Sequence, residues 1–286
     1  MTVLDNLSSG YRSNLQTLAG LTFLQGDIRD ARAVGQAMAG RDVVFHMAAS
    51  VGNKRSIDSP ILDAEVNVMG TLRVLEAARA AGVRKVVTSS SAGIFGELKT
   101  LPIREDHAID PDSPYGASKL CAEKETLAFG KLFGMETVCL RYFNVYGPNQ
   151  RFDAYGNVIP IFVFQMLGGE RLTIFGDGRQ TRDFVNVRDV VEANIRAAST
   201  AGVRGAFNIG SGSRIAIHEL VRKLAAAAGI EPWVVYGAPR PGDVRDSLAD
   251  ISAARAAFGF EPAVGLDEGL AEYVDWARQE QRCHAA

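Results

Sequence analysis

Short apolar runs rich in β-branched residues alternate with longer amphipathic stretches along the first half of the chain. This alternation is typical of a parallel sheet covered by helices. The apolar runs predict strands over 2–5, 21–24, 42–47, 85–90 and 137–142, and the amphipathic stretches predict helices over 31–39, 62–81 and 115–133. Val66, Met69, Leu72, Leu75 and Ala78 recur at helical intervals and predict the core side of the second helix.

After Pro148 the regularity changes to a polar loop through Gly156, followed by apolar stretches over 159–167 and 172–175. With 286 residues the chain exceeds the usual size of one domain. We therefore expect an α/β protein with a sheet domain over 1–150 and a smaller mixed α/β domain over 151–286.

The composition indicates which kinds of binding partner and cellular environment are favoured. The net charge is −2, with 31 basic and 33 acidic residues, so nothing favours nucleic acid or an anionic membrane. Cys121, Cys139 and Cys283 are odd in number and widely spaced, which favours a reducing cytoplasm, with the first two as core thiols. We expect no metal site, because the four histidines lack metal-ligand spacing, and no membrane span or leader.

The best clue to chemistry lies in the segment 113–119, Ser-Pro-Tyr-Gly-Ala-Ser-Lys. Pro114 suits the first turn of a helix, so Tyr115 and Lys119 should lie on one helical face. A nearby ammonium group favours a phenolate, so we expect Lys119 to lower the pKa of Tyr115 and make it a base. Ser91 comes 24 positions earlier, at the end of a predicted strand, where its hydroxyl could hold the same substrate oxygen.

These residues occur among further motifs in a fixed order. The others are Leu-Asp-Asn-Leu-Ser-Ser-Gly at 4–10, Gly-Asp-Ile-Arg-Asp at 26–30, Phe-His-Met-Ala-Ala at 45–49, Asn-Val-Met-Gly-Thr at 67–71, Leu-Arg-Tyr-Phe-Asn-Val-Tyr-Gly-Pro at 140–148, Thr-Arg-Asp-Phe-Val at 181–185 and Arg-Pro-Gly-Asp at 240–243. In these motifs and their order the chain resembles the extended short-chain dehydrogenase/reductase family. Within that family it resembles the NAD-dependent nucleotide-sugar epimerases of the UDP-glucose 4-epimerase type.

The resemblance implies a doubly wound, Rossmann-type sheet that binds NAD, and a substrate-binding cap from which segments around 180–210, including 183–187, return to the sheet. It implies epimerisation at C4 of a UDP-hexose through a transient 4-keto sugar. Tyr115 would take the C4 hydroxyl proton, Lys119 would contact the nicotinamide ribose, and Ser91 would hydrogen-bond the C4 oxygen. The family commonly forms homodimers through two helices per subunit, here 62–81 and 115–133.

The resemblance also implies contacts to the cofactor and substrate. Asp5 would accept hydrogen bonds from the adenosine ribose, which favours NAD over NADP. The other cofactor positions are Asn6, Asp27, Ile28, Ala48, Ala49, Asn67, Ser89, Tyr115, Lys119 and Tyr142. The substrate positions are Ser91, Asn144, Asn157, Val158, Phe175, Arg182, Arg240, Asp243 and Ser247, with Arg182 and Arg240 suited to a diphosphate.

One departure concerns the cofactor. Family members begin with a strand and a Gly-x-x-Gly-x-x-Gly turn that holds the pyrophosphate against a helix N-terminus. Residues 2–5 match the family's second strand, so the first strand, the glycine turn and the first helix are expected to be absent. Two explanations stay open: a misassigned start, or a real truncation with impaired cofactor binding.

Two positions bear on the reaction and its substrate. Family 4,6-dehydratases follow the serine with Asp-Glu, whereas Ala92-Gly93 here cannot transfer protons, which disfavours dehydration. Ser247 is small where family members use a large residue to exclude N-acetylated sugars, so we hypothesise that N-acetylhexosamine forms are accepted. A UDP-glucuronate 4-epimerase, a nucleotide-sugar reductase and a non-catalytic nucleotide-binding relative remain alternatives.

Overall fold

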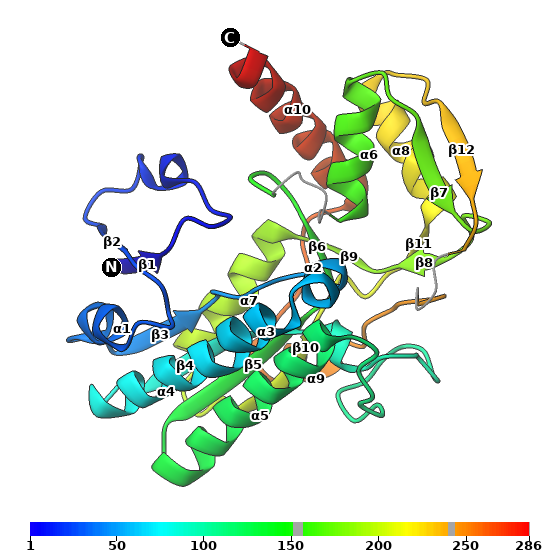
Figure 1. Cartoon of the computed structure of the whole chain (residues 1–286). Coiled ribbons are helices and arrows are strands. Elements are labelled where there is room, and N and C mark those ends of the chain that lie inside the picture. Colours follow the sequence, from blue (N-terminus) through cyan, green and yellow to red (C-terminus); the bar gives the residue numbers. More distant parts are fainter. Residues whose placement is uncertain (151–156, 240–243, 286) are drawn as a thin grey trace. The chain divides into compact units, whose positions relative to one another are not determined.

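The computed structural model describes residues 1–150, 157–239 and 244–285. The chain folds into two compact units (Figure 1). Unit 1 comprises Met1–Gly96, Ala108–Arg141 and Asn194–Phe207, and unit 2 comprises Glu97–His107, Tyr142–Ala193 and Asn208–Ala286. Each unit is therefore assembled from three separate stretches of the chain.

The parallel strands of unit 1 confirm the predicted α/β class. Four strands form one sheet in the order β10-β5-β4-β3, namely Gly205–Ile209, Glu136–Tyr142, Lys85–Ser91 and Val43–His46. A second parallel sheet pairs β1 (Thr2–Asp5) with β2 (Thr22–Gln25). No strand in the described part of the chain pairs with both β1 and β3, so the two sheets stay separate.

Helices α1 (Ala31–Met38), α4 (Thr71–Ala80) and α5 (Pro114–Phe133) lie close to the predicted ranges. The remaining helical segments of unit 1 are η1 (Arg12–Leu15), α2 (Asn53–Asp58), α3 (Pro60–Ala64), η2 (Glu65–Gly70) and η3 (Ala92–Ile94), while α7 (Val187–Ser199) enters the unit at its second half. Leu4 and Val44, from the separate sheets, pack against one apolar cluster that includes Val34, Leu75 and Val86.

The predicted helix over 62–81 is divided by a π-helical turn, η2, between α3 and α4. A π turn holds more residues than an α turn, so it shifts which side chains face inward. Asn67 and Gly70 are buried there, whereas Met69 is 50% exposed. The prediction of Met69 as a core residue is therefore wrong.

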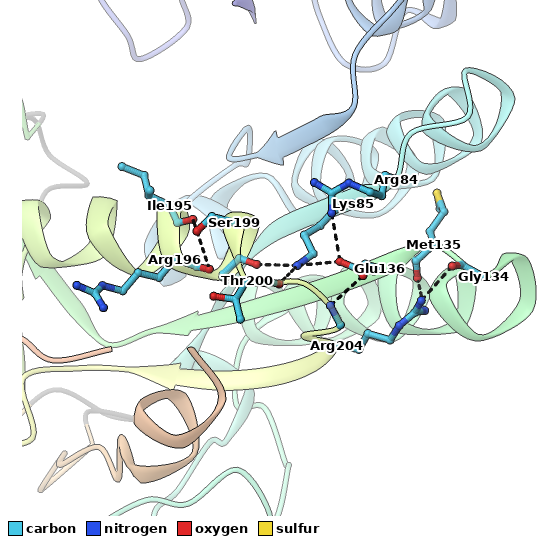
Figure 2. Close-up of polar contacts among 12 residues, drawn as sticks. Arg84, Lys85, Gly134, Met135, Glu136, Ile195, Arg196, Ser199, Thr200 and Arg204 are labelled. Atoms are coloured by element: carbon cyan, nitrogen blue, oxygen red, sulfur yellow. Dashed lines mark hydrogen bonds and ion pairs between the residues drawn. The ribbon is translucent and has the colours of Figure 1, made fainter. Parts of the chain in front are cut away.

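The later chain returns to the main sheet through a different strand from the expected segment 183–187. The strand that joins it is β10, next to β5, whereas β9 (Phe184–Asn186) pairs with β6 (Asn144–Tyr146) elsewhere. The buried Lys85, at the start of β4, holds the chain near this point (Figure 2). Its Nζ donates to the main-chain oxygens of Ala197 and Thr200, at the end of α7, over 2.9 and 2.6 Å.

Within its described residues, unit 2 contains three two-stranded sheets and a helical layer. Besides β6 and β9, β7 (Leu172–Phe175) pairs with β12 (Val234–Gly237), and β8 (Thr181–Arg182) pairs with β11 (Ile215–Ala216). The helices are α6 (Val158–Leu167), α8 (Ile217–Ala228), α9 (Ser252–Phe258) and α10 (Leu266–Ala285). Side chains of α6, α8 and α10 share one core with residues such as Tyr146, Leu172 and Phe184.

Two further expectations concern single features. Cys139 is buried as predicted, but Cys121 is exposed on α5, so its prediction as a core thiol is wrong.

None of the helices described is both long and apolar enough to cross a membrane.

Candidate active site

Helix α5 begins at the predicted place and presents Tyr115 and Lys119. Ser113 caps it, with its Oγ accepting a 3.1 Å hydrogen bond from the Gly116 N–H, and Pro114 occupies the first turn. Tyr115 is partly buried, while Lys119, one turn further, is only 4% exposed. The start of the helix is thus fixed by local sequence, as expected.

The end of β4 brings Ser91 to Tyr115. The two side chains hydrogen-bond to each other, and the Ser91 Oγ also accepts from the Gly93 N–H at 3.1 Å. Two glycines permit this approach, since a Cβ on Gly116 would lie 2.4 Å from the Gly93 oxygen. Larger residues at Gly116 would push the helix start away from the turn that carries Ser91.

The pKa of Tyr115 does not follow the prediction. Burial raises it, the negative charge of Asp63 raises it further, and the hydrogen bond with Ser91 acts in the opposite direction. The expectation that Lys119 lowers this pKa is wrong for the free protein, because the Lys119 Nζ instead donates to the Ser89 oxygen over 2.6 Å. The protein by itself therefore holds Tyr115 as a neutral phenol.

Lys119 is a buried amine whose pKa is lowered to about 8 by burial. Cys139, Asp63 and Glu123 act against this decrease. The amine also lies 3.4 Å from the Ser89 Oγ, so Ser89 and Ser91 both face the start of α5. Lys119 can thus lose its proton near neutral to mildly alkaline pH.

A buried ion pair under the same helix was not predicted from the sequence. Glu123, one turn after Lys119, accepts hydrogen bonds from Arg141 over 2.8 and 3.0 Å and from the Ser90 Oγ over 2.7 Å. Arg141 also stacks over the Phe95 ring at 5.2 Å. The pair fixes α5 against β4 and β5, and its only signal in the sequence was a charged residue at helical spacing from Lys119.

The predicted adenosine-side positions gather after β1 and β2. Asp5 accepts a 2.6 Å hydrogen bond from the Leu7 N–H, which holds the turn after β1. Asn6 donates to Asp27 over 2.9 Å, linking the two strand ends. An ion pair with Arg29 lowers the pKa of Asp27, so this group is a carboxylate at neutral pH. The Ile28 side chain is buried in the apolar cluster, so only its main chain is available to a ligand.

The other cofactor positions lie along the end of β3 and on neighbouring segments. Ala48 is exposed and Ala49 partly buried, just after β3. Tyr142 is the last residue of β5 and belongs to unit 2. Asn67 is 2% exposed, and its carboxamide is already bonded to both main-chain groups of Ser50. Asn67 therefore shapes the loop after β3 from within.

These residues fit some parts of NAD better than others. The Asp5 carboxylate suits a ribose diol, and Lys119 with Ser89 suits the nicotinamide ribose. A pyrophosphate needs main-chain N–H groups in a glycine-rich turn at the start of a helix, and the chain contains no Gly-x-x-Gly-x-x-Gly sequence. The residues present thus fit the two ends of the dinucleotide and lack the usual cradle for its centre.

The substrate positions that the structure describes lie in unit 2, apart from Ser91. The Asn144 amide donates to the Asp183 oxygen over 3.0 Å, next to β8 and β9. Arg182 and the buried Ser247 approach each other through Thr181, whose oxygen accepts from both. Phe175 ends β7 and is partly buried. Asn157 precedes α6 without a side-chain cap, and Val158 starts that helix. Arg240 and Asp243 lie outside the described residues.

Unit 2 also contains a cavity of about 940 Å³. Its lining includes Arg182, Phe184, Arg214, Arg222 and Lys223, but none of the other predicted substrate positions described above. This cavity is therefore distinct from the surroundings of Ser247 and Asn144. No cluster of three or more potential metal ligands occurs among the described residues.

Comparison with known proteins agrees with this fold. Residues 1–210 match the model of the NAD dependent epimerase/dehydratase family. A UDP-glucose 4-epimerase from Mycolicibacterium smegmatis is 40% identical over 284 residues, covering 98% of this chain and 91% of that protein. The chain therefore belongs to the NAD dependent epimerase/dehydratase family, and its cofactor is NAD.

Two solved structures extend the likeness to three dimensions. The UDP-glucose 4-epimerase of Thermotoga maritima, solved with UDP-glucose, has a TM-score of 0.93 and 38% identity over 98% of this chain and 91% of its own. A UDP-N-acetylglucosamine 4-epimerase from Methanobrevibacter ruminantium, in complex with UDP-N-acetylmuramic acid, has a TM-score of 0.93 and 34% identity, over 98% and 90%. The Rossmann-type fold predicted from the sequence is confirmed.

Proposed function

We propose that this protein is an NAD-dependent 4-epimerase of UDP-hexoses. The observation that carries the proposal is the packing of Ser91, Tyr115 and Lys119 at the contact of β4 with the start of α5. Their hydroxyl, phenol and amine are the groups needed to move a proton on and off a sugar hydroxyl. The names of the similar proteins support the same activity.

The chain's own residues handle the proton. Tyr115 takes the proton from the C4 hydroxyl of the sugar and later returns it to the same oxygen, while Ser91 holds that oxygen by a hydrogen bond. Lys119 does not lower the pKa of Tyr115 in the free protein. We propose that its ammonium favours the Tyr115 phenolate only once NAD and the sugar are bound, since an adjacent cation favours the ionised phenol. When bound, NAD would supply the acceptor and donor of hydride for C4, which is the redox chemistry that a transient 4-keto sugar requires.

Inversion at C4 requires the sugar to turn over in its site, while the UDP group stays bound. The groups that support UDP binding are Arg182, Asn144 and the main chain at the start of α6, with Asn157 and Val158. Arginine suits a diphosphate through paired, charge-assisted hydrogen bonds. Phe175 and Ser247 belong to the same set of proposed substrate contacts, as do Arg240 and Asp243.

Dehydration is not favoured. After Ser91 the chain forms the turn η3, in which Ala92 and Gly93 carry no acid or base. Elimination of water across C5 and C6 needs a further pair of proton-transfer groups. The turn after β4 can therefore support hydride and proton exchange at C4 alone.

Two finer features belong to the proposal. We expect Ser247 to leave space at C2 of the sugar, and therefore expect UDP-N-acetylglucosamine to be converted beside UDP-glucose. We also expect a homodimer, because Ile61, Leu62 and Met69 are 73, 44 and 50% exposed on α3 and η2, next to α5. The free thiols Cys121 and Cys139 are consistent with a reducing cytoplasm.

The decisive experiment incubates the purified chain with NAD and UDP-glucose in D₂O and follows the sugar by proton NMR. A 4-epimerase gives UDP-galactose that retains hydrogen at C4, since the hydride never exchanges with water. A product with a C6 methyl group would show a dehydratase, and deuterium at C4 would show direct deprotonation. Either result would overturn the proposal.

Matched variants assign the chemistry to the site. Tyr115→Phe should lower kcat by about two to four orders of magnitude, the usual contribution of a positioned acid–base group. Tyr236→Phe is the control, because that tyrosine is 62% exposed on β12. Parallel assays with UDP-N-acetylglucosamine test the space at Ser247, and conversion of UDP-glucose alone would contradict it.

A further inference from the structure

Asp63 is a buried carboxylate without a cationic partner. It lies on α3, is 1% exposed, and forms no ion pair with any residue in the described part of the chain. Burying an ionised carboxylate in this way costs free energy unless hydrogen bonds stabilise it. Two donors do so here, Asn67 and Ser118. The proposed reaction as described above gives Asp63 no role.

The hydrogen bonds of Asp63 connect three segments around the candidate site. The Ser118 Oγ, on α5, lies 2.5 Å from one carboxylate oxygen of Asp63, and the Asn67 Nδ2, on η2, donates to the other over 3.1 Å. Asn67 also donates to Ser118 over 3.0 Å and holds the loop after β3 through Ser50. Asp63 thus accepts from Ser118, on the helix with Tyr115, and is linked through Asn67 to the loop with Ala48 and Ala49.

The π turn makes this arrangement possible. It directs Asn67 inward beside Asp63, four residues earlier, while Gly70 presses against Ile28 so closely that a Cβ would lie 2.5 Å from its Cδ1. On α5, the Ser118 Oγ is also 3.1 Å from the main-chain oxygen of Tyr115, three residues earlier in the same helix. A shift of Asp63 would therefore move the turn that carries Tyr115.

The charge of Asp63 also acts on the candidate catalytic groups. It raises the pKa of both Tyr115 and Lys119. Other groups face the same pair: Glu123 and Cys139 raise the pKa of Lys119 as well. Lys119 helps to keep His46 neutral, with a pKa lowered to about 3 mainly by burial.

The remaining charges near α5 are engaged elsewhere or lie at its margin. On α2, Lys54 pairs with Asp58 over 2.6 Å, and Arg55 follows it. On η2, Glu65 pairs with Arg29 over 3.1 Å. Arg141, from β5, is bound to Glu123. Asp63 is therefore the one unpaired carboxylate among these charged groups.

We propose that Asp63 is a positioning residue of the catalytic centre, which holds Tyr115 in place through Ser118 and whose charge sets the pH range in which Tyr115 and Lys119 act. Removal of the charge should move the pH profile of kcat as a whole to lower pH. Loss of a hydrogen bond alone should lower the height of the profile without moving it. This inference rests on the proposed 4-epimerase function.

The test compares two variants with the wild-type chain in the presence of NAD and UDP-glucose. Asp63→Asn keeps the shape and removes the charge, and Ser118→Ala keeps the charge and removes the hydrogen bond that joins Asp63 to the start of α5. Asp106→Asn is the control, since Asp106 is exposed and pairs with Arg104, which is exposed as well. We expect Asp63→Asn to shift the kcat profile to lower pH, and Ser118→Ala to reduce kcat by about tenfold with KM nearly unchanged.

A spectroscopic titration separates this inference from the proposed function. The absorbance of tyrosinate is measured against pH in four proteins. Subtracting the curve of Tyr115→Phe from that of the wild type isolates the Tyr115 transition. Subtracting the curve of the double variant Asp63→Asn/Tyr115→Phe from that of Asp63→Asn isolates the same transition without the Asp63 charge. The Tyr115 transition should occur at lower pH when Asp63 is neutral, whether or not the chain epimerises any sugar. If Asp63→Asn does not fold, Asp63→Ser takes its place in both measurements.

The outcomes are distinct. An unchanged tyrosinate transition together with an unshifted kcat profile overturns the electrostatic role, and an unchanged kcat in Ser118→Ala overturns the positioning role. Absence of epimerase activity in the wild type contradicts the proposed function instead, and leaves the titration as the test of Asp63.

Discussion

The Lys85 ammonium, fully buried at the start of β4, lies 2.9 Å from the Glu136 carboxylate at the start of β5 (Figure 2). The same carboxylate accepts from the Gly202 N–H, and Lys85 caps the end of α7. The pair therefore joins two strands of the main sheet to a segment that lies 112 to 115 residues from Lys85 and 66 residues from Glu136 in sequence.

We predict that Lys85→Met destabilises the protein by about 3 kcal/mol, because breaking a buried pair leaves its other partners unsatisfied. The measurement is urea unfolding followed by circular dichroism. Arg84→Met is the matched control, since Arg84 contacts the same carboxylate at 3.4 Å but is 53% exposed. Exposed pairs contribute about 0–1 kcal/mol, so a similar loss in both variants would contradict a special role for Lys85.

The stability of this pair should depend on pH. The hydrogen bond with Lys85 lowers the pKa of Glu136 below its unfolded value. A depressed pKa contributes stability that is fully present above about pH 4.3 and is lost as pH falls through the folded value. The difference in unfolding free energy between wild type and Lys85→Met should therefore shrink in acid; a difference that is constant from pH 7 to pH 3 would refute this explanation.

Gly116→Ala should damage catalysis by geometry alone. The new methyl group would meet the Gly93 oxygen at 2.4 Å, so helix α5 and the turn with Ser91 must separate. A misplacement of about 1 Å can cost about 100-fold in rate, which kcat/KM would report. Gly35→Ala in α1 is the control: its methyl group meets nothing within 4 Å, and alanine should stabilise that helix slightly.

The activity itself should rise with pH in the neutral range. Lys119 has a pKa of about 8, and the pKa of Tyr115 is raised above its ordinary value. The active form of this pair has one proton for the two groups together, so it forms when the fully protonated pair loses its first proton. We expect kcat/KM for UDP-glucose to increase through about pH 8. A profile that is already flat from pH 6 would mean that bound NAD or substrate resets both groups.

Ile61→Asp should convert a dimer into a monomer, because a buried carboxylate in an apolar contact between subunits is costly. Light scattering after gel filtration gives the mass directly. Leu18→Asp introduces the same charge at a residue that is 48% exposed in a loop, and should leave the mass unchanged. A monomeric wild type would contradict the proposed homodimer.

Local patterns predicted much of this molecule. The approximate β4 and α5 boundaries followed from an apolar strand and from a proline suited to the first turn of a helix, which placed Ser91 and Tyr115 at neighbouring element ends. What escaped prediction depends on long-range packing. The exposure of Met69 follows from a π turn that helical periodicity does not reveal.

The electrostatics of the site were equally hidden. A Tyr-x-x-x-Lys spacing says which side chains share a face, but the pKa of Tyr115 depends on burial and on Asp63, 52 positions earlier. The Glu123–Arg141 pair joins residues from a helix and a later strand, and its hydrogen bonds exist only once both are packed. Such networks are properties of the folded chain.

The separation of the two sheets in unit 1 has a consequence for local dynamics. Asp5 stands on a two-stranded ladder, while Ser91 stands on a four-stranded one. Two-stranded ladders are marginally stable by themselves, so amide protons of β1 and β2 should exchange with solvent sooner than those of β4. A dinucleotide that touches both ladders would then slow exchange at β1 and β2 more than at β4, making hydrogen exchange a direct reporter of cofactor capture.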